Sequence, residues 1–454
     1  MKYKRLLVAK ELSTNLRPFN EKWRFKGLKV DEELLRGVMY KTAESIDPDS
    51  HIIALYYLEG KASLTKMAEE TAIECSTGTW TVVGYETLEL RKRYGAKILR
   101  IMGSEGACYV QIAYEASNYD PEVGGITCLL SDIAGNLYDM KILDNVKLID
   151  ISFPKYWTKA YPGPKFGVAG TRKLLGLEGA ERPLIGAITK PNIGLDTKTY
   201  AQLAFETAKS GIDFIKDDEA LVNPKYCPLM DRVVAVTEAL DRAREETGKK
   251  VLYAVNITTA PHRLVELAEK VLGAGANHLM VCMAYTGYGG VQALAEDPSV
   301  NVPIHVHRCG HGAYTRNPKH GIDSSLMSKL VRLCGGDQLH VGSVAGKFYY
   351  DTLDTMRCLS ALRDEWGSIK PTLPVSSAGN HPGNIKANME VMGNDMLFLA
   401  GGGIHGHPDG STAGGRAMMQ AVEAALQGIP VERAVAEYPE LGKAVEKWGY
   451  VKAW

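Results

Sequence analysis

The chain has 454 residues, and its 53 lysines and arginines are balanced by 53 aspartates and glutamates. A net charge of zero argues against nucleic acid or an anionic membrane surface as the main partner. There is no apolar run of about 18 residues that would span a membrane, and the charged stretch 1–5 is not followed by a signal-peptide core. We therefore expect a cytoplasmic protein. The 8 cysteines form no CxxC pair and are expected to be reduced packing residues.

Residues 1–160 predict an α+β domain with an antiparallel sheet. Short alternating patterns predict strands, at 51–58, 79–83, 96–102 and 109–116. Charged stretches around 64–75 and 85–95 predict helices between them. Residues 151–175, rich in proline, glycine, tyrosine and lysine, are expected to form the connection to a second domain.

Residues 161–454 show a different rhythm, in which apolar strands alternate with amphipathic helices. The predicted strands cover 183–190, 214–219, 251–258, 278–284, 302–308, 338–343, 373–379 and 396–402. Helical spacing is clearest at 200–210, 232–246, 263–274 and 324–334. Eight such units in about 240 residues favour a closed (β/α)₈ barrel, followed by a helical tail, over an open sheet. Catalytic groups are then expected where the strands end.

The second predicted barrel strand ends in four consecutive ionisable residues, Lys216 to Glu219. Such a run is often a solvated loop, yet here it leaves an apolar strand, where unpaired charge is costly. A divalent cation would remove that cost, and oxygen ligands suit Mg²⁺. The sequence therefore predicts a magnesium site at the strand end.

Other polar groups fall at the same predicted rim. Lys190 ends the first strand and is a candidate general base beside a metal. His305 and His307 alternate on the fifth strand; with His311 they leave a zinc site open, whereas Arg308 favours phosphate or carboxylate recognition. The stretch 342–347 lacks the spacing of a nucleotide-binding loop and is interpreted as a mobile lid with a lysine at its tip.

Several long motifs, in order, resemble the large chain of ribulose-bisphosphate carboxylase (RuBisCO). They are 74–80 (ECSTGTW), 135–136 (GN), 190–195 (KPNIGL), 211–219 (GIDFIKDDE), 305–311 (HVHRCGH) and 335–340 (GGDQLH), with Ser377 and Gly401-Gly402 downstream. The resemblance covers about residues 70–410. It implies a (β/α)₈ TIM barrel preceded by an α+β domain of the ferredoxin-like kind, and an obligate homodimer or a higher oligomer of dimers.

The resemblance also implies a role for each matching residue. Lys216, carbamylated by CO₂, would hold Mg²⁺ together with Asp218 and Glu219. Catalytic roles would fall to Glu74, Asn136, Lys190, Lys216, His307 and Lys347, and substrate or phosphate contacts to Thr79, Trp80, Asn192, Arg308, His340, Ser377, Gly379, Gly401 and Gly402. Glu74 and Asn136 would reach the site from the partner subunit. The substrate implied is a small sugar phosphate.

Four departures bear on the reaction. Asn192 stands where carboxylases have a second lysine, Phe348 replaces a leucine, Ala378 a glycine and Leu399 a glutamine. Such changes resemble RuBisCO-like proteins (form IV), which enolise, isomerise or decarboxylate other phosphorylated ketoses or keto acids without fixing CO₂. Asn136 disfavours the methylthio-ketose enolases, and Lys347 favours chemistry in which CO₂ forms or leaves. The sequence thus predicts a RuBisCO-like enolase, isomerase or carboxy-lyase. The alternatives are a genuine carboxylase, a non-catalytic binding protein and a zinc hydrolase.

Overall fold

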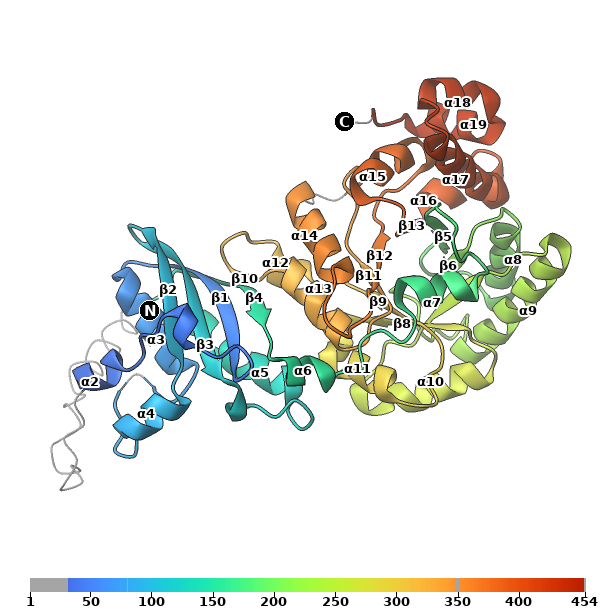
Figure 1. The fold of residues 1–454 in the computed structure, drawn as a ribbon. Helices are drawn as coiled ribbons and strands as arrows, with labels where there is room; N and C mark the ends of the chain where they lie inside the picture. Colours follow the sequence, from blue (N-terminus) through green and yellow to red (C-terminus); the bar gives the residue numbers. More distant parts are fainter. Residues whose placement is uncertain (1–31, 80, 348–350, 453–454) are drawn as a thin grey trace, which may run out of the picture.

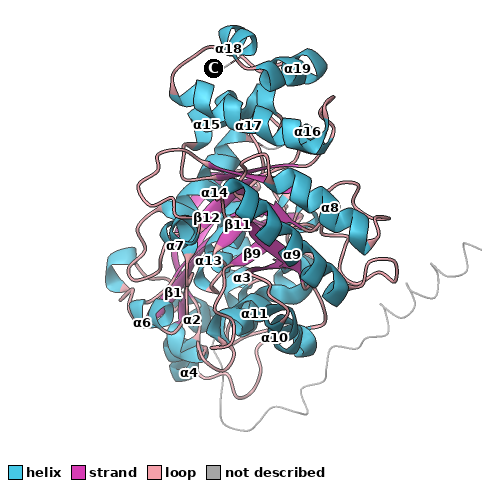
Figure 2. Ribbon diagram, turned by 90° about the vertical axis from the view of Figure 1, so that its right-hand side faces the viewer, coloured by secondary structure: helices cyan, strands magenta, loops and turns pink. Residues whose placement is uncertain are grey.

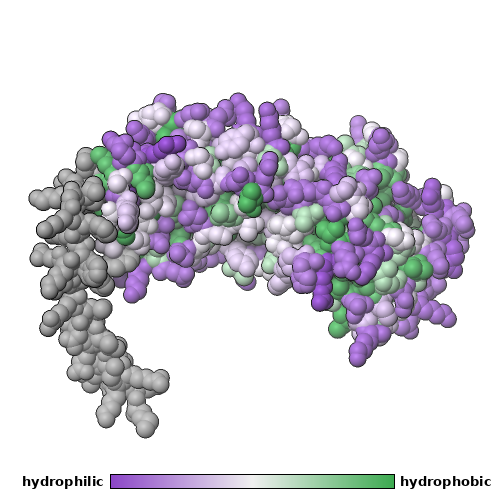
Figure 3. Space-filling model, turned by 90° about the horizontal axis from the view of Figure 1, so that it is seen from below, coloured by the Kyte–Doolittle hydropathy of each residue, from purple (hydrophilic) through white to green (hydrophobic). Residues whose placement is uncertain are grey.

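The computed structural model describes residues 32–79, 81–347 and 351–452. Figure 1 shows two parts side by side, an N-terminal domain built on an open sheet and a barrel ringed by helices. The outline is elongated, and the face seen in Figure 3 is mainly hydrophilic, with smaller hydrophobic groups between the charged side chains. Among the described residues, no helix is long and apolar enough to cross a membrane.

The N-terminal domain has the β-α-β-β-α-β order expected of a ferredoxin-like fold, with one additional helix before its second strand. Its elements are β1 (His51–Glu59), α3 (Leu64–Glu74), α4 (Leu88–Tyr94), β2 (Lys97–Ser104), β3 (Ala107–Glu115), α5 (Gly125–Ile133) and β4 (Asn145–Ser152). β1 buries every second side chain, Ile52, Ala54, Tyr56 and Leu58, because one face of the sheet packs on the helices. Short elements complete the region, namely α2 (Glu32–Gly37), η2 (Ala43–Ser45), η3 (Ala116–Asn118), η4 (Asn136–Asp139), α6 (Lys155–Lys159) and α7 (Gly167–Leu174).

One strand of the N-terminal sheet comes from the second part of the sequence. The order of strands in this sheet is β10-β4-β1-β3-β2, and β10 (Gly321–Ile322), from the barrel half of the sequence, pairs parallel with β4. Lys147 on β4 donates hydrogen bonds to the carbonyls of Thr315 (3.2 Å) and Asn317 (2.7 Å). The predicted antiparallel sheet is therefore extended by a strand from the other domain.

The barrel closes through eight parallel strands, as predicted. They are β5 (Leu184–Ile188), β6 (Phe214–Lys216), β7 (Leu252–Asn256), β8 (His278–Cys282), β9 (Ile304–His307), β11 (Gln338–His340), β12 (Leu373–Ser376) and β13 (Leu397–Ala400), and β13 pairs with β5. Each is shorter than predicted because the end residues of the predicted runs already belong to the connecting loops or, after β8, to the helix that follows.

Helices surround these strands (Figure 2). They are α8 (Thr197–Ala208), α9 (Leu229–Thr247), α10 (Leu264–Gly273), α11 (Met283–Glu296), α13 (Ser324–Leu333), α14 (Thr352–Arg363), α15 (Ile385–Met392) and α17 (Gly410–Leu426). Aspartate side chains cap the starts of α8, α13 and α14 by accepting from a backbone N–H in the first turn. The remaining elements are η5 (Pro261–Arg263), α12 (Gly312–Thr315), η6 (Pro382–Asn384), α16 (Gly402–His405), α18 (Val431–Glu437) and α19 (Pro439–Trp448).

Two predictions were wrong. Residues 79 and 81–83 form no strand, while β4 and β10 were not foreseen. The cysteines are free, but they are not all packing residues, because Cys128 is exposed and Cys309 is half-buried. The other six are buried.

Candidate active site

A cavity of about 640 Å³ opens at the C-terminal ends of the barrel strands. It is lined by many of the residues predicted to form the site: Lys190, Asn192, Glu219, His307, Arg308, His340, Lys347, Ser377, Gly379, Gly401 and Gly402. These residues follow six different strands, so only barrel closure brings them together.

The predicted metal residues lie at one edge of this cavity. Lys216, the last residue of β6, is fully buried, and its Nζ lies 3.9 Å from Oε2 of Glu219. Burial lowers the pKa of Lys216, which favours the neutral amine, although Glu219 and Asp218 oppose this. Burial also disfavours ionised Glu219, yet His307 and Lys216 lower its pKa overall. A buried amine and two carboxylates are therefore concentrated at one strand end.

Asp217 faces the opposite way. Its carboxylate accepts hydrogen bonds from Tyr200 (2.7 Å), Tyr253 (2.7 Å) and Arg232 (3.1 Å), between the barrel wall and helices α8 and α9. The backbone N–H of Asn256 also donates to it, at 3.0 Å. Alternation along β6 explains this, because Phe214, Lys216 and Asp218 share the inner face while Asp217 lies on the outer one. The run of four charges thus divides between the site and the fold.

Lys190 bridges the metal residues and the substitution at position 192. Its Nζ donates to Oδ2 of Asp218 at 2.5 Å and to Oδ1 of Asn192 at 2.8 Å. A lysine at position 192 would repel this ammonium, whereas the asparagine accepts from it. Gly401 allows the approach, since a β-carbon there would lie 2.8 Å from Cε of Lys190.

The histidines occupy two layers. His305 is fully buried, and its two ring nitrogens lie 2.7 Å from Gln338 Oε1 and 2.7 Å from His340 Nε2. His340 in turn contacts Ser377 Oγ at 2.7 Å. His307 lies one layer higher, with Nε2 3.5 Å from Glu219 Oε2. Burial lowers the pKa of His305 and of His340, so both rings are held neutral.

The three histidines do not form the zinc site that the sequence left open as an alternative. We looked among the described residues for groups of three or more histidine, cysteine or carboxylate side chains that could hold a metal ion. The group found is Cys282, His307 and Cys309, whose ligand atoms all lie within 4.8 Å of one another. His305 and His311 do not join that group. The reason is the layering, which places His305 in the barrel interior.

The loop that carries Lys347 is fastened at its base. The backbone N–H of Lys347 donates to the carbonyl of Ala378 at 2.8 Å, and a β-carbon on Gly379 would lie only 2.5 Å from that nitrogen. Ala378 itself has a φ of 76°, which L-residues rarely adopt. Phe348, one of the four departures from the family pattern, lies outside the described residues, as does Trp80.

Sequence reasoning missed three parts of the cavity. Trp448, at the end of α19, lines it with His381, and their rings lie 6.0 Å apart. Asn380, buried on the loop after β12, accepts from Ser343 Oγ at 2.9 Å and so ties two rim loops together. Cys309 follows the predicted histidines but was interpreted only as a packing residue. Asn380 could have been found from its place close to the predicted Ser377. No pattern in the sequence indicated that Trp448, in the C-terminal tail, would lie at the rim.

Glu74, Asn136 and Thr79 lie in the N-terminal domain and do not line the cavity of their own chain. Glu74 ends α3 and is half-buried; Asn136 begins η4, and both Asn136 and Thr79 are exposed. α3 and η4 contact each other. Glu74 and Asn136 therefore belong to neighbouring elements of the N-terminal domain.

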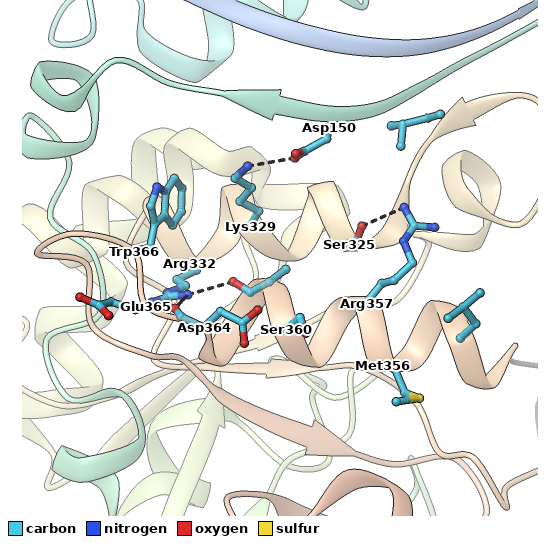
Figure 4. Close-up of a pocket in the computed structure, with 13 residues that line it drawn as sticks. Asp150, Ser325, Lys329, Arg332, Met356, Arg357, Ser360, Asp364, Glu365 and Trp366 are labelled. Atoms are coloured by element: carbon cyan, nitrogen blue, oxygen red, sulfur yellow. Dashed lines mark hydrogen bonds and ion pairs between the residues drawn. The ribbon is translucent and has the colours of Figure 1, made fainter. Parts of the chain in front are cut away.

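A second cavity, of about 580 Å³, lies between β4, α13 and α14. Its cations already have partners (Figure 4): Lys329 pairs with Asp150 at 2.9 Å, and Arg357 donates to Ser325 at 3.3 Å. Arg332 donates to the carbonyls of Ala361 and Asp364. These contacts hold the two domains and two helices together, so the chemistry is assigned to the rim cavity.

Comparison with known families agrees with the motifs. Residues 39–157 match the model of the ribulose bisphosphate carboxylase large chain, N-terminal domain, and residues 167–448 match that of its catalytic domain. The chain belongs to the RuBisCO large-chain family. The first matched segment contains strands β1 to β4 of the N-terminal sheet, and the second contains β10 and the whole barrel.

Relatives come from both branches of the family. The chain is 36% identical over 419 residues to the ribulose bisphosphate carboxylase of Methanocaldococcus jannaschii, covering 88% of this chain and 97% of that protein. The octameric RuBisCO structure from Pyrococcus horikoshii has a TM-score of 0.85 at 32% identity, covering 92% and 98% of the two chains. A RuBisCO-like protein from Alicyclobacillus acidocaldarius has a TM-score of 0.79 at 34% identity, covering 88% and 100%.

Proposed function

We propose that this protein is a Mg²⁺-dependent enzyme that enolises a phosphorylated ketose in the rim cavity. The observation that carries the proposal is the buried Lys216 beside Asp218 and Glu219, with Lys190 bonded to Asp218. Family membership supports it, because the chain matches the catalytic-domain model and its curated relative from Methanocaldococcus jannaschii is a ribulose bisphosphate carboxylase.

The residues present fit the expected metal. Lys216 is fully buried and tends toward the neutral amine, the form that reacts with CO₂ to give an anionic carbamate. With Asp218 and Glu219 it would supply the hard oxygen ligands that Mg²⁺ prefers. When bound, the ion would polarise a carbonyl and stabilise negative charge that develops on oxygen.

The protein side chains divide the remaining tasks. Lys190, at the cavity edge, is the group placed to carry a proton to or from substrate carbon. His307 stands beside Glu219, where its ring can hydrogen-bond a substrate hydroxyl. Arg308, His340 and Ser377 form one side of the cavity, where cationic and hydroxyl donors suit a phosphate. Gly401 and Gly402 leave room for a second phosphate against the backbone on the other side.

The overall reaction we favour is carboxylation of ribulose 1,5-bisphosphate. The sequence departures alone favour the non-carboxylating RuBisCO-like branch, but the curated relative reported above and another from Pyrococcus furiosus are ribulose bisphosphate carboxylases. Lys347, at the cavity, supports the same choice, because a cation there suits a carboxylate that forms during turnover.

Enolisation without net CO₂ fixation is the second candidate. The observation that favours it is Asn192, an amide that now accepts from Lys190 where carboxylases have a lysine. Leu399 adds to it, because this residue is fully buried in the barrel interior and offers no hydrogen bond to a substrate. The solved RuBisCO-like relative is as similar in sequence as several carboxylases.

One assay separates the two candidates. The enzyme is preincubated with bicarbonate and Mg²⁺, then given ribulose 1,5-bisphosphate with labelled CO₂. We expect label in phosphoglycerate. A parallel proton NMR assay in D₂O, with a panel of phosphorylated ketoses and keto acids, scores deuterium uptake. Exchange without fixation would select the second candidate, and the absence of both exchange and fixation would reject the enolase proposal.

Two subunits are proposed to complete each site. Related RuBisCOs are octameric in Pyrococcus horikoshii and dimeric in Hyperthermus butylicus, the latter 32% identical with a TM-score of 0.84 over 92% of this chain and 100% of that one. In this chain, Glu74 and Asn136 lie outside their own cavity. A homodimer that brings these residues to the partner's barrel would account for both observations.

A further inference from the structure

Two cysteines and a histidine meet at the edge of the rim cavity. Cys282 is the last residue of β8 and lies opposite His307 in the parallel ladder with β9. Cys309 follows two residues after His307. The two sulfur atoms and a ring nitrogen of His307 all lie within 4.8 Å of one another. The group is assembled from two strand ends, so it does not follow from one local motif.

Backbone hydrogen bonds hold the three residues of this group in place. Cys282 is 2% exposed, and its backbone N–H donates to Thr258 Oγ1 at 3.0 Å, which fixes the end of β8. The backbone N–H of Cys309 donates to His307 Nδ1 at 3.1 Å, which fixes the turn after β9. His307 and Cys309 both line the cavity, so one side of the group faces open space.

The geometry points to a binding site for a thiophilic divalent cation such as Zn²⁺, held by Cys282, Cys309 and His307. Two thiolates and one imidazole form a Cys₂His ligand set, which suits zinc and leaves a fourth position for water or a substrate oxygen. Mg²⁺ is a hard cation that prefers oxygen ligands, so it would not compete for the sulfur atoms.

Binding would change the contacts of His307. Its ring nitrogens now accept from the Cys309 N–H and lie 3.5 Å from Glu219, so a coordinate bond would replace one of these contacts. Both thiols lose their protons to solvent when the metal binds, and no oxidant is needed. Because His307 also faces the rim cavity, a bound Zn²⁺ would remove it from substrate binding and inhibit the enzyme.

The test measures binding directly, so it does not depend on the proposed reaction. The full-length protein, kept reduced, is titrated with Co²⁺ as a spectroscopic probe and dialysed against Zn²⁺ at limiting concentration. We expect a sulfur-to-cobalt charge-transfer band and one Zn²⁺ per chain. Cys309→Ser, at a half-buried position, and Cys282→Ser should each lose the charge-transfer band. Each should also bind Zn²⁺ at least about 10- to 100-fold more weakly, because removing even a residue that only supports a metal ligand has an effect of this size.

Two controls separate this site from other metal binding. Cys128→Ser removes an exposed thiol elsewhere on the molecule and should leave the band unchanged. Asp218→Asn weakens the proposed Mg²⁺ site and should leave the thiolate band in place. Thermal unfolding checks that each variant is folded. A wild-type protein without the band, or a band that persists in both Cys282→Ser and Cys309→Ser, would overturn the inference.

Discussion

Neighbouring carboxylates at the end of β6 belong to two different regions of the molecule. Asp217 is buried in the wall between the barrel and helices α8 and α9, with four hydrogen bonds to fixed partners. Asp218 points into the barrel and shares Lys190 with Asn192 at the cavity edge. Wall and rim thus use the same chemical group differently. In the wall, the carboxylate of Asp217 is held by hydrogen bonds within the fold. At the rim, the proposed metal ion would replace Lys190 as the partner of Asp218.

The largest expected effect is on the rim. Lys216→Met keeps the volume of the buried side chain but removes the amine that CO₂ would modify. We expect activity to fall by about 10³-fold or more, because the metal's contribution of several kcal/mol is lost. Carbon-13 NMR with labelled bicarbonate and Mg²⁺ should show a carbamate signal in the wild type and none in Lys216→Met.

The matched control is Lys209→Met, at a partly exposed lysine that caps the end of α8 and pairs with Glu246. It should retain both the carbamate signal and the activity. A Lys216→Met protein that still shows the signal would place the modified lysine elsewhere.

The second largest expected effect is a loss of stability when the Asp217 network in the barrel wall is disrupted. Asp217→Asn leaves Arg232 as an uncompensated buried charge, and both side chains are fully buried. We expect the free energy of unfolding to fall by about 3–5 kcal/mol, measured by urea denaturation. Asp241→Asn, at an exposed position on α9, should change it by less than about 0.5 kcal/mol. Equal stability of the two variants would mean that the Asp217 network adds nothing.

Mixed subunits test whether the rim is complete in one chain. Glu74→Gln and Lys216→Met homodimers should both be inactive. Random mixing gives about half heterodimers, each with one intact and one doubly defective site, so about a quarter of the wild-type activity should return. Activity is measured after co-refolding the variants in equal amounts. No recovery, with heterodimers confirmed by mass spectrometry, would contradict a shared site.

The barrel and most of its rim were predictable because alternation and strand ends carry that information. All eight barrel strands were found from apolar runs, and the rim residues followed from their ends. The outward position of Asp217 was also implicit in the alternation through Phe214 and Lys216. By contrast, β10 is too short to show a pattern, and Trp448 reaches the cavity only through the packing of a distant helix.

Below the rim, His278 makes the interior sensitive to acid. It is fully buried against Phe214, and neither ring nitrogen has a hydrogen-bond partner among the described residues. Burial lowers its pKa from 6.5 to about 3. The stability of the neutral ring is therefore fully present above pH 6.5 and is lost as the pH falls toward 3. At pH 5 the loss should be about 2 kcal/mol.

His278→Met should remove this part of the pH dependence. Unfolding curves between pH 7 and pH 4.5 would show it as a smaller fall in stability than in the wild type. His262→Gln, at an exposed position on η5, should leave the pH dependence unchanged. An unaltered pH dependence in His278→Met would show that other groups cause the acid sensitivity.

The smallest expected effect returns to the rim, at Ala378. Its φ of 76° places an L-residue in the left-handed region, at a cost of about 1–2 kcal/mol. Ala378→Gly removes this strain but adds about 0.5–1 kcal/mol of unfolded-state entropy, so the net stabilisation should be about 0.5–1 kcal/mol. Ala436→Gly, on the exposed side of α18, should have the opposite sign because no strain is relieved there. Urea denaturation of both variants measures the difference.

If Ala378→Gly is destabilising to the same extent as Ala436→Gly, the strained backbone is absent in solution. Stabilisation would mean that this chain tolerates backbone strain at the residue whose carbonyl holds the Lys347 loop.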